Sequence, residues 1–167
     1  MTDPTAARIA MAFNRLFLGS HRTLLHGGGT EPLYEPATCG QPARIVHTLD
    51  FPASALHEVA HWCLAGRRRR QMRDYGYWYV PGPRDPQQRA AFFSAEAEVQ
   101  ALEAVLASMC GVRFVVSADD FAAAPEELEQ FTQVVHARIA ARRRGPLPPR
   151  AAAFMAALAE EFVSEHG

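Results

Sequence analysis

One short stretch limits what this chain can fold into more than any other: "SALHEVAHWCLAG", residues 54–66. It places His57 and His61 four residues apart, and Glu58 follows the first histidine directly. Residues four apart lie on the same face of an α-helix, with about 5–6 Å between their Cβ atoms. Two imidazoles in that position can bind one metal ion without distorting the backbone. The stretch therefore predicts a helix that presents a metal site, which another part of the fold must complete.

The residues around this stretch predict where the helix begins and ends. Asp50 and Pro52 form a helix start, with Asp50 as the N-cap and the proline in the first turn, and we expect the helix to end near Gly66. Upstream, "ARIVHTL" (43–49) has the β-branched content of a short strand, and residues 26–42, rich in Gly and Pro, predict a loop or an extended segment. Downstream, "DYGYWYVPGPRDP" (74–86) predicts a short strand that ends in a turn.

The remaining pattern is mostly helical. Apolar periodicity and composition predict helices over residues 5–18, 86–109, 125–143 and 147–165. Residues 111–120, "GVRFVVSADD", predict a third strand or an extended run. Because there are no internal repeats and no long linker, we predict one compact α+β domain over residues 1–167, with several helices around a small sheet.

The overall composition excludes several classes of protein. Hydrophobic residues make up 49% and charged residues 21%, as in a soluble globular protein, and a net charge of −1 gives no case for nucleic-acid binding. No stretch approaches the roughly 18 apolar residues of a membrane span, and the N-terminus reads as an amphipathic helix instead of a signal. Cys39, Cys63 and Cys110 are odd in number and widely spaced, which favours reduced thiols in a cytoplasmic protein. No pattern indicates an oligomeric state.

Two histidines need at least one more protein ligand to hold a metal ion. The acid-rich segment "SAEAEVQALEA" (94–104) offers Glu96, Glu98 and Glu103. Glu96 and Glu103 lie seven residues apart and share one helical face, whereas Glu98 points elsewhere. A third histidine in the pattern HExxHxxGxxH is absent, because an arginine run begins at residue 67. Composition alone leaves the choice among the three glutamates open.

Two histidines and one carboxylate can support two chemistries. With zinc, the open position holds a water for hydrolysis, and Glu58 would polarise that water as in HExxH metallopeptidases. With iron, the same donors leave positions for dioxygen and substrate, as in non-haem oxygenases. The spacing of the ligands does not distinguish these chemistries.

Four segments in this order resemble the bacterial elongation factor P hydroxylase family: "EPLYEP", "RIVHTLDFPASALHEVAHWCLAG", "RRRRQMRDYGYWYVPGPRDPQ" and "EVQALE". The resemblance runs from about Glu31 to about Phe121. Its most specific parts are the HExxHW core with its "AG" ending and the "DYGYWYVPGPRD" block, because a bare HExxH would not single out this family.

The resemblance implies an iron-dependent hydroxylase with dioxygen as co-substrate and elongation factor P as protein substrate. It implies that the enzyme acts on the β-lysyl-modified lysine of that factor and completes its modification. Its implied metal ligands are His57, His61 and Glu96, with Glu98 ranked second, while Glu58 would orient ligands or handle protons. The implied fold has a metal-bearing helix of the zincin type, not the double-stranded β-helix of 2-oxoglutarate oxygenases. A zinc-dependent metallopeptidase is the alternative.

Several residues outside the motif are candidate substrate contacts. Tyr77 and Tyr79 could line the entrance to the metal, although core packing competes for them. Asp85 could meet the lysine ammonium, although turn or cap duty competes. The arginines at residues 67–70, with Arg73, predict a solvated basic face or a surface that docks an acidic protein, with Arg68 as its candidate contact.

Overall fold

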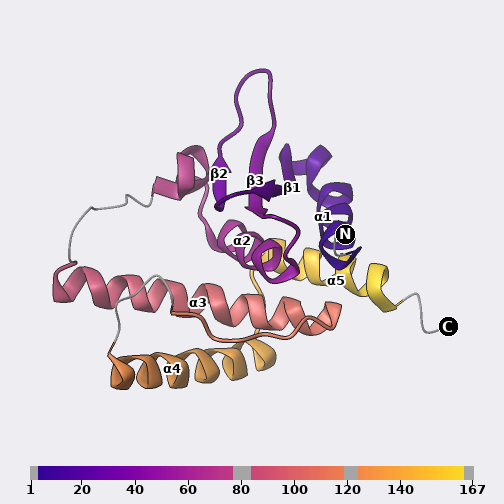
Figure 1. Ribbon diagram of the computed structural model, residues 1–167. Coiled ribbons are helices and arrows are strands. Elements are labelled where there is room, and N and C mark those ends of the chain that lie inside the picture. The colour runs from indigo at the N-terminus through magenta and orange to yellow at the C-terminus, as the bar shows by residue number, and fades with distance from the viewer. Residues whose placement is uncertain (1–3, 77–83, 119–123, 164–167) are drawn as a thin grey trace.

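The computed structural model describes residues 4–76, 84–118 and 124–163, and within them five α-helices surround a three-stranded sheet (Figure 1). The first half of the chain forms α1 (Pro4–His21), β1 (Thr23–Gly29), β2 (Leu33–Glu35), β3 (Ala43–Thr48) and α2 (Pro52–Leu64). Two 3-10 turns follow, η1 (Arg69–Gln71) and η2 (Arg73–Gly76), and then α3 (Pro86–Cys110), α4 (Pro125–Arg144) and α5 (Pro149–Val163). The predicted α+β class is confirmed.

The sheet is mixed and has the order β1-β3-β2. The central strand β3, which was predicted, pairs parallel with β1 and antiparallel with β2. Both partners lie largely within the Gly- and Pro-rich region that predicted only a loop or an extended segment. A glycine is needed there because a Cβ on Gly27 would lie 2.3 Å from the carbonyl oxygen of Leu49 and 2.6 Å from the ring of His47. The glycines therefore permit close backbone approach within the sheet.

The main hydrophobic core lies between the sheet, α1, α2 and α5. Trp62 of α2 is 1% exposed, and its ring lies 5.2 Å from that of Phe13 and 4.8 Å from that of Phe17. The guanidinium of Arg150, at the start of α5, lies over the Trp62 ring at 4.7 Å and donates to the carbonyls of Trp62, Cys63 and Ala65. These carbonyls have no helical partner at the end of α2, so the arginine from α5 caps it. Trp62 therefore anchors the core.

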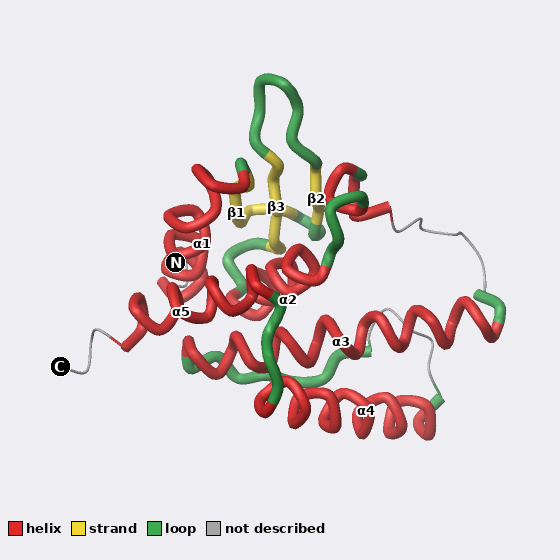
Figure 2. The backbone as a smooth tube through the Cα atoms, turned by 180° about the vertical axis from the view of Figure 1, so that it is seen from behind, coloured by secondary structure: helices red, strands yellow, loops and turns green. Residues whose placement is uncertain are grey.

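The long helix α3 lies between α2 on one side and α4 on the other in both views (Figures 1 and 2). On the α4 side, Ala97 and Ala101 pack against Phe131 and Val135. On the α2 side, Leu102 and Leu106 join the main core. Burial on both sides fixes the rotation of α3 about its axis and therefore the direction of its carboxylates.

The predicted helices agree with the structure to within a few residues at their ends, apart from details of the caps. The predicted N-cap of α2 is wrong, because Phe51 occupies that position without a side-chain cap bond and Pro52 opens the helix. Residues 112–118 form no strand pairs among the described residues. Instead, the side chain of Gln100 accepts from the nitrogen of Ser117 at 3.0 Å and donates to its oxygen at 2.6 Å. Among the described helices, none is both long enough and apolar enough to cross a membrane.

The strand that was predicted to begin at residue 74 is wrong for residues 74–76, because Arg73–Gly76 form the turn η2. Asp74 and Tyr75 adopt left-handed conformations, with φ of 47° and 59°. Asp74 accepts a hydrogen bond from the backbone nitrogen of Tyr34 at 2.9 Å, and the Tyr75 ring stacks on the Tyr34 ring at 4.2 Å. These contacts anchor the turn to the edge strand β2. Residues 77–83, the rest of the predicted strand and turn, lie outside the described residues.

Gly27→Ala tests the close approach within the sheet. We expect it to lower the free energy of unfolding by about 1–3 kcal/mol, because the new methyl group overlaps the Leu49 carbonyl. Gly19→Ala is the matched control, since no atom lies within 4 Å of its added Cβ and alanine favours the helix by about 0.5 kcal/mol. Urea unfolding measures the free energy of unfolding of both variants. Equal changes of the same sign in the two variants would contradict a steric requirement for glycine at residue 27.

Candidate metal centre

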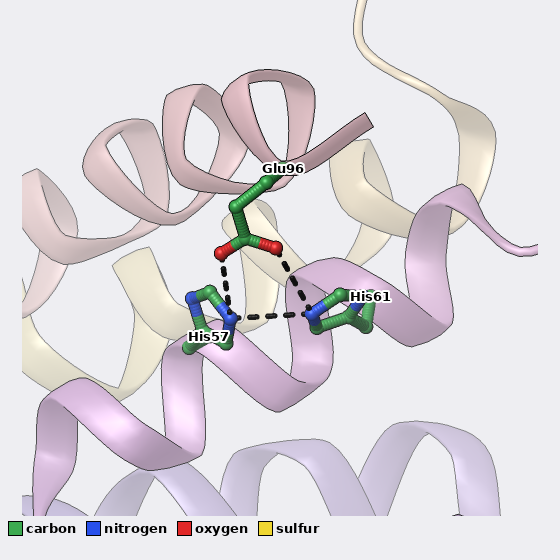
Figure 3. A group of neighbouring side chains, drawn as sticks. All are labelled: His57, His61 and Glu96. Carbon is green, nitrogen blue, oxygen red and sulfur yellow. Dashed lines mark hydrogen bonds and ion pairs between the residues drawn. The ribbon is translucent and has the colours of Figure 1, made fainter. Parts of the chain in front are cut away.

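The two histidines of α2 face a glutamate of α3 across the contact between the helices. Figure 3 shows His57 and His61 projecting toward Glu96. The two Nε2 atoms lie 3.2 Å apart, and the Glu96 carboxylate lies 3.3 Å from Nε2 of His57 and 3.8 Å from Nε2 of His61. One donor atom from each residue lies within 4.8 Å of the others. Two imidazole nitrogens and one carboxylate at these separations form a set that could hold zinc or Fe(II).

Glu103 contacts the other side of the His57 ring. It is 8% exposed, and its Oε2 lies 2.7 Å from Nδ1 of His57. A carboxylate in this position keeps the proton on Nδ1 and so directs Nε2 toward the other donors. The sequence placed Glu103 on the same helical face as Glu96, which is confirmed. Its contact with the far nitrogen of His57 was not foreseen, although the seven-residue spacing within an acid-rich helix was the signal for it.

Glu98 lies on the opposite side of α3, as the helical periodicity predicted. Its carboxylate pairs with Arg138 and Arg142 of α4, each at 2.8 Å. The three glutamates that composition left undistinguished therefore have three different surroundings. Glu96 is the one whose oxygens face both imidazoles.

Comparison with known proteins identifies the family. A family model described as elongation factor P hydroxylase matches residues 12–166. The chain belongs to the elongation factor P hydroxylase family. It is 37% identical over 158 residues to the elongation factor P lysine hydroxylase of Haemophilus influenzae, a match that covers 94% of this chain and 89% of that protein. The resemblance read from the sequence is confirmed, and it extends beyond residues 31–121 into α4 and α5.

In this member of the hydroxylase family, the surroundings shift the pKa values of the two histidines in opposite directions. Burial lowers the pKa of His57, but the hydrogen bond and charge of Glu103, followed by the charges of Glu96 and Glu58, raise it to about 9. Burial and the neighbouring His57 cation lower the pKa of His61 to about 3. The two shifts therefore run in opposite directions at rings whose Nε2 atoms lie 3.2 Å apart.

Glu58 lies beside this group but contributes no donor atom to it. It is 8% exposed, and burial raises its pKa to about 7, with the His57 cation opposing that rise and the charges of Glu96, Asp74 and Glu103 adding to it. Its carboxyl can therefore gain or lose a proton near neutral pH. This property suits a residue that handles protons next to the metal ligands.

Tyr75 joins the turn η2 to the metal centre. Its ring is stacked nearly parallel to that of His61, at 6.2 Å and 15°, and its other neighbour is Tyr34. Its hydroxyl is buried without a hydrogen-bond partner among the described residues, and burial raises its pKa well above the usual value. Tyr75 is 4% exposed, in line with the core packing that competes with a substrate role.

The four predicted substrate contacts have different locations. Tyr77 and Tyr79 lie outside the described residues. Asp85 is the N-cap of α3, where its Oδ1 accepts from the nitrogen of Gln88 at 2.7 Å, so the competing cap role is confirmed. Arg68 is exposed at the start of the turn that follows α2. Neither Asp85 nor Arg68 belongs to the group of donor residues at the candidate metal centre.

Glu103→Gln tests the contact that orients His57. In the metal-free protein we expect the pKa of His57 to fall from about 9 to its ordinary 6.5 or below, because burial is then opposed by fewer charges. Between these pH values the variant's ring would be neutral where the wild-type ring is cationic. An NMR titration of the imidazole Cε1–H signals measures this. Glu98→Gln is the control, and an unchanged His57 titration in Glu103→Gln would contradict the assignment.

Proposed function

We propose that this chain hydroxylates the β-lysyl-modified lysine of elongation factor P and thereby completes the modification of that protein. One observation carries the proposal: a chain of this hydroxylase family brings two imidazoles and a carboxylate together at one point. The Haemophilus influenzae relative is an elongation factor P lysine hydroxylase, and the proposal takes its protein substrate and its target lysine from that relative. We also propose that residues 1–167 form a single metal-dependent hydroxylase domain.

The metal that we propose is Fe(II), held by Nε2 of His57, Nε2 of His61 and the carboxylate of Glu96. The donor set fits, because these atoms already face one another and include one anionic oxygen. When bound, Fe(II) would supply the redox chemistry with dioxygen that insertion of oxygen into an unactivated C–H bond requires, which zinc does not. Zinc is the alternative ion for the same donors.

The residues of the chain would prepare this site in three ways. Glu103 would hold the His57 ring so that Nε2 faces the metal, and the proton on that nitrogen would leave when the metal binds. Glu58 would keep or release a proton on its carboxyl oxygen near neutral pH beside the ligands. Tyr75, stacked against His61, would limit the rotation of that ring and exclude water from its far face.

The substrate contacts remain proposals that follow from chain position. Tyr77 and Tyr79 follow Tyr75 closely in the sequence and would lie near the entrance to the metal. Asp85 is exposed and would offer a carboxylate to the lysine ammonium, and Arg68 would contact the protein substrate.

The proposed reaction predicts a change in the mass of elongation factor P. Incubation of the modified, unhydroxylated factor with the Fe(II)-loaded protein, a reductant and dioxygen should add about 16 mass units, one oxygen atom. Intact-mass spectrometry measures this directly, and the zinc-loaded protein is the control that should leave the mass unchanged. An unchanged mass with Fe(II) would refute the proposal. So would tight zinc binding together with peptide cleavage that Glu58→Gln abolishes.

Glu96→Gln and Glu98→Gln form a matched pair that tests the third ligand. We expect Glu96→Gln to weaken Fe(II) binding by more than about 100-fold, because an amide oxygen replaces the anionic donor. Glu98→Gln should bind Fe(II) like the wild type, since its carboxylate pairs with Arg138 and Arg142. Metal analysis after equilibrium dialysis measures both, and the reverse order would assign the ligand to Glu98.

A further inference from the structure

Exposed arginines follow directly after the helix that carries the histidines. Arg67, Arg68, Arg69 and Arg73 are all exposed, and we call these four side chains the basic face. They belong to the segment that contains η1 and η2, which lies next to β2 at the edge of the sheet (Figure 1). The net charge of the whole chain is −1, so this concentration of positive charge is local.

The arginines of this chain differ in how their charge is balanced. Six of them meet carboxylates: Arg8 and Arg15 pair with Glu161, Arg44 with Glu35, Arg89 with Glu127, and Arg138 and Arg142 with Glu98. Within the described parts of the chain, Arg67, Arg68 and Arg73 have no ion pair. The acid of the same segment, Asp74, accepts from the nitrogen of Tyr34 instead. The positive charge of these three arginines is therefore available to a partner.

The backbone that carries the basic face is held in a defined shape. Arg70 donates to the carbonyl of Ala65 at 2.6 Å, and the hydroxyl of Tyr34 donates to the carbonyl of Arg70 at 2.7 Å. Arg69 reaches the carbonyl of Tyr75 at 3.4 Å. These bonds join the segment to the end of α2 and to β2. A partner would therefore meet guanidinium groups on a supported surface and not on a free tail.

A cavity beside the basic face adds a second feature that suits acidic groups. It has a volume of about 180 Å³ and lies between the arginine segment and the start of β1. Its polar lining includes Arg67, Arg70, Gln71, His21 and Thr23, and among the described residues no acidic side chain lines it. Guanidinium and amide donors without a competing carboxylate match an aspartate or glutamate side chain.

The segment that carries the basic face also contacts one of the candidate metal ligands. Tyr75, two residues after Arg73, stacks on the ring of His61. A lysine that reaches the metal centre on a folded protein must bring the surface around that lysine close to this segment. Charges at such a rim steer the encounter and fix its orientation more than they add to the buried contact.

We propose that the basic face docks an acidic surface of the protein substrate, with one carboxylate side chain entering the adjoining cavity, and so delivers the target lysine to the metal centre. This inference rests on the proposed function, since it takes the substrate to be a folded protein. It assigns the recognition of that protein to Arg67, Arg68 and Arg73, which have no contact with the metal ligands.

The test measures binding and hydroxylation separately. The probe is elongation factor P with its modified, unhydroxylated lysine, and its Kd for the metal-loaded protein is measured at about 50 and 150 mM salt. The triple variant Arg67→Gln, Arg68→Gln, Arg73→Gln should bind about tenfold more weakly at the lower salt and lose most of the salt dependence. The matched control is Arg113→Gln, Arg143→Gln, Arg144→Gln, which removes three exposed charges outside the basic face and should bind like the wild type.

The outcomes separate this inference from the function on which it rests. Wild-type hydroxylation with equal Kd values for both triple variants would overturn the docking role and leave the function intact. Salt-sensitive binding through the three arginines without any gain of oxygen would support docking and refute the function. If the triple variant does not fold, Arg68→Glu replaces it, because its side chain is exposed; unchanged binding by that variant would overturn the inference.

Discussion

The packing of α3 against two helices determines what each of its carboxylates can do. On the side of α2, Glu96 and Glu103 meet the His57 ring from opposite nitrogens, at 3.3 and 2.7 Å. On the side of α4, Glu98 forms ion pairs with two arginines. Consecutive residues of a helix point about 100° apart, so a small rotation of α3 would move every one of these groups away from its partner. The small side chains between α3 and α4 and the leucines toward α2 prevent that rotation.

The same packing gathers negative charge around the His57 ring. Three buried or half-buried carboxylates, those of Glu58, Glu96 and Glu103, act on the His57 ring. Their charge raises the pKa of His57 to about 9, while burial raises that of Glu58 to about 7. A divalent ion held by the same donors would offset this carboxylate charge.

Local periodicity was enough to predict the parts of the site that lie on helices. The four-residue spacing of His57 and His61 and the shared face of Glu96 and Glu103 depend only on helical geometry, and both are confirmed. Choosing Glu96 over Glu103 as the residue facing both imidazoles required the crossing of α2 and α3, which no local pattern contains. The predictions for the sheet edge failed for a similar reason. Asp74 and Tyr75 form a turn because they contact Tyr34, which lies 40 residues earlier in the chain.

The cap that Arg150 places on α2 has a consequence for how the site is made. The histidine helix ends at Leu64, but three of its last carbonyls are bound by a guanidinium from the start of α5. Arg150 lies 88 residues after Trp62 in the sequence, so that bond cannot form until those residues have been synthesised. The histidines are therefore synthesised long before their helix is complete, and a nascent chain would expose them without the support of the finished fold.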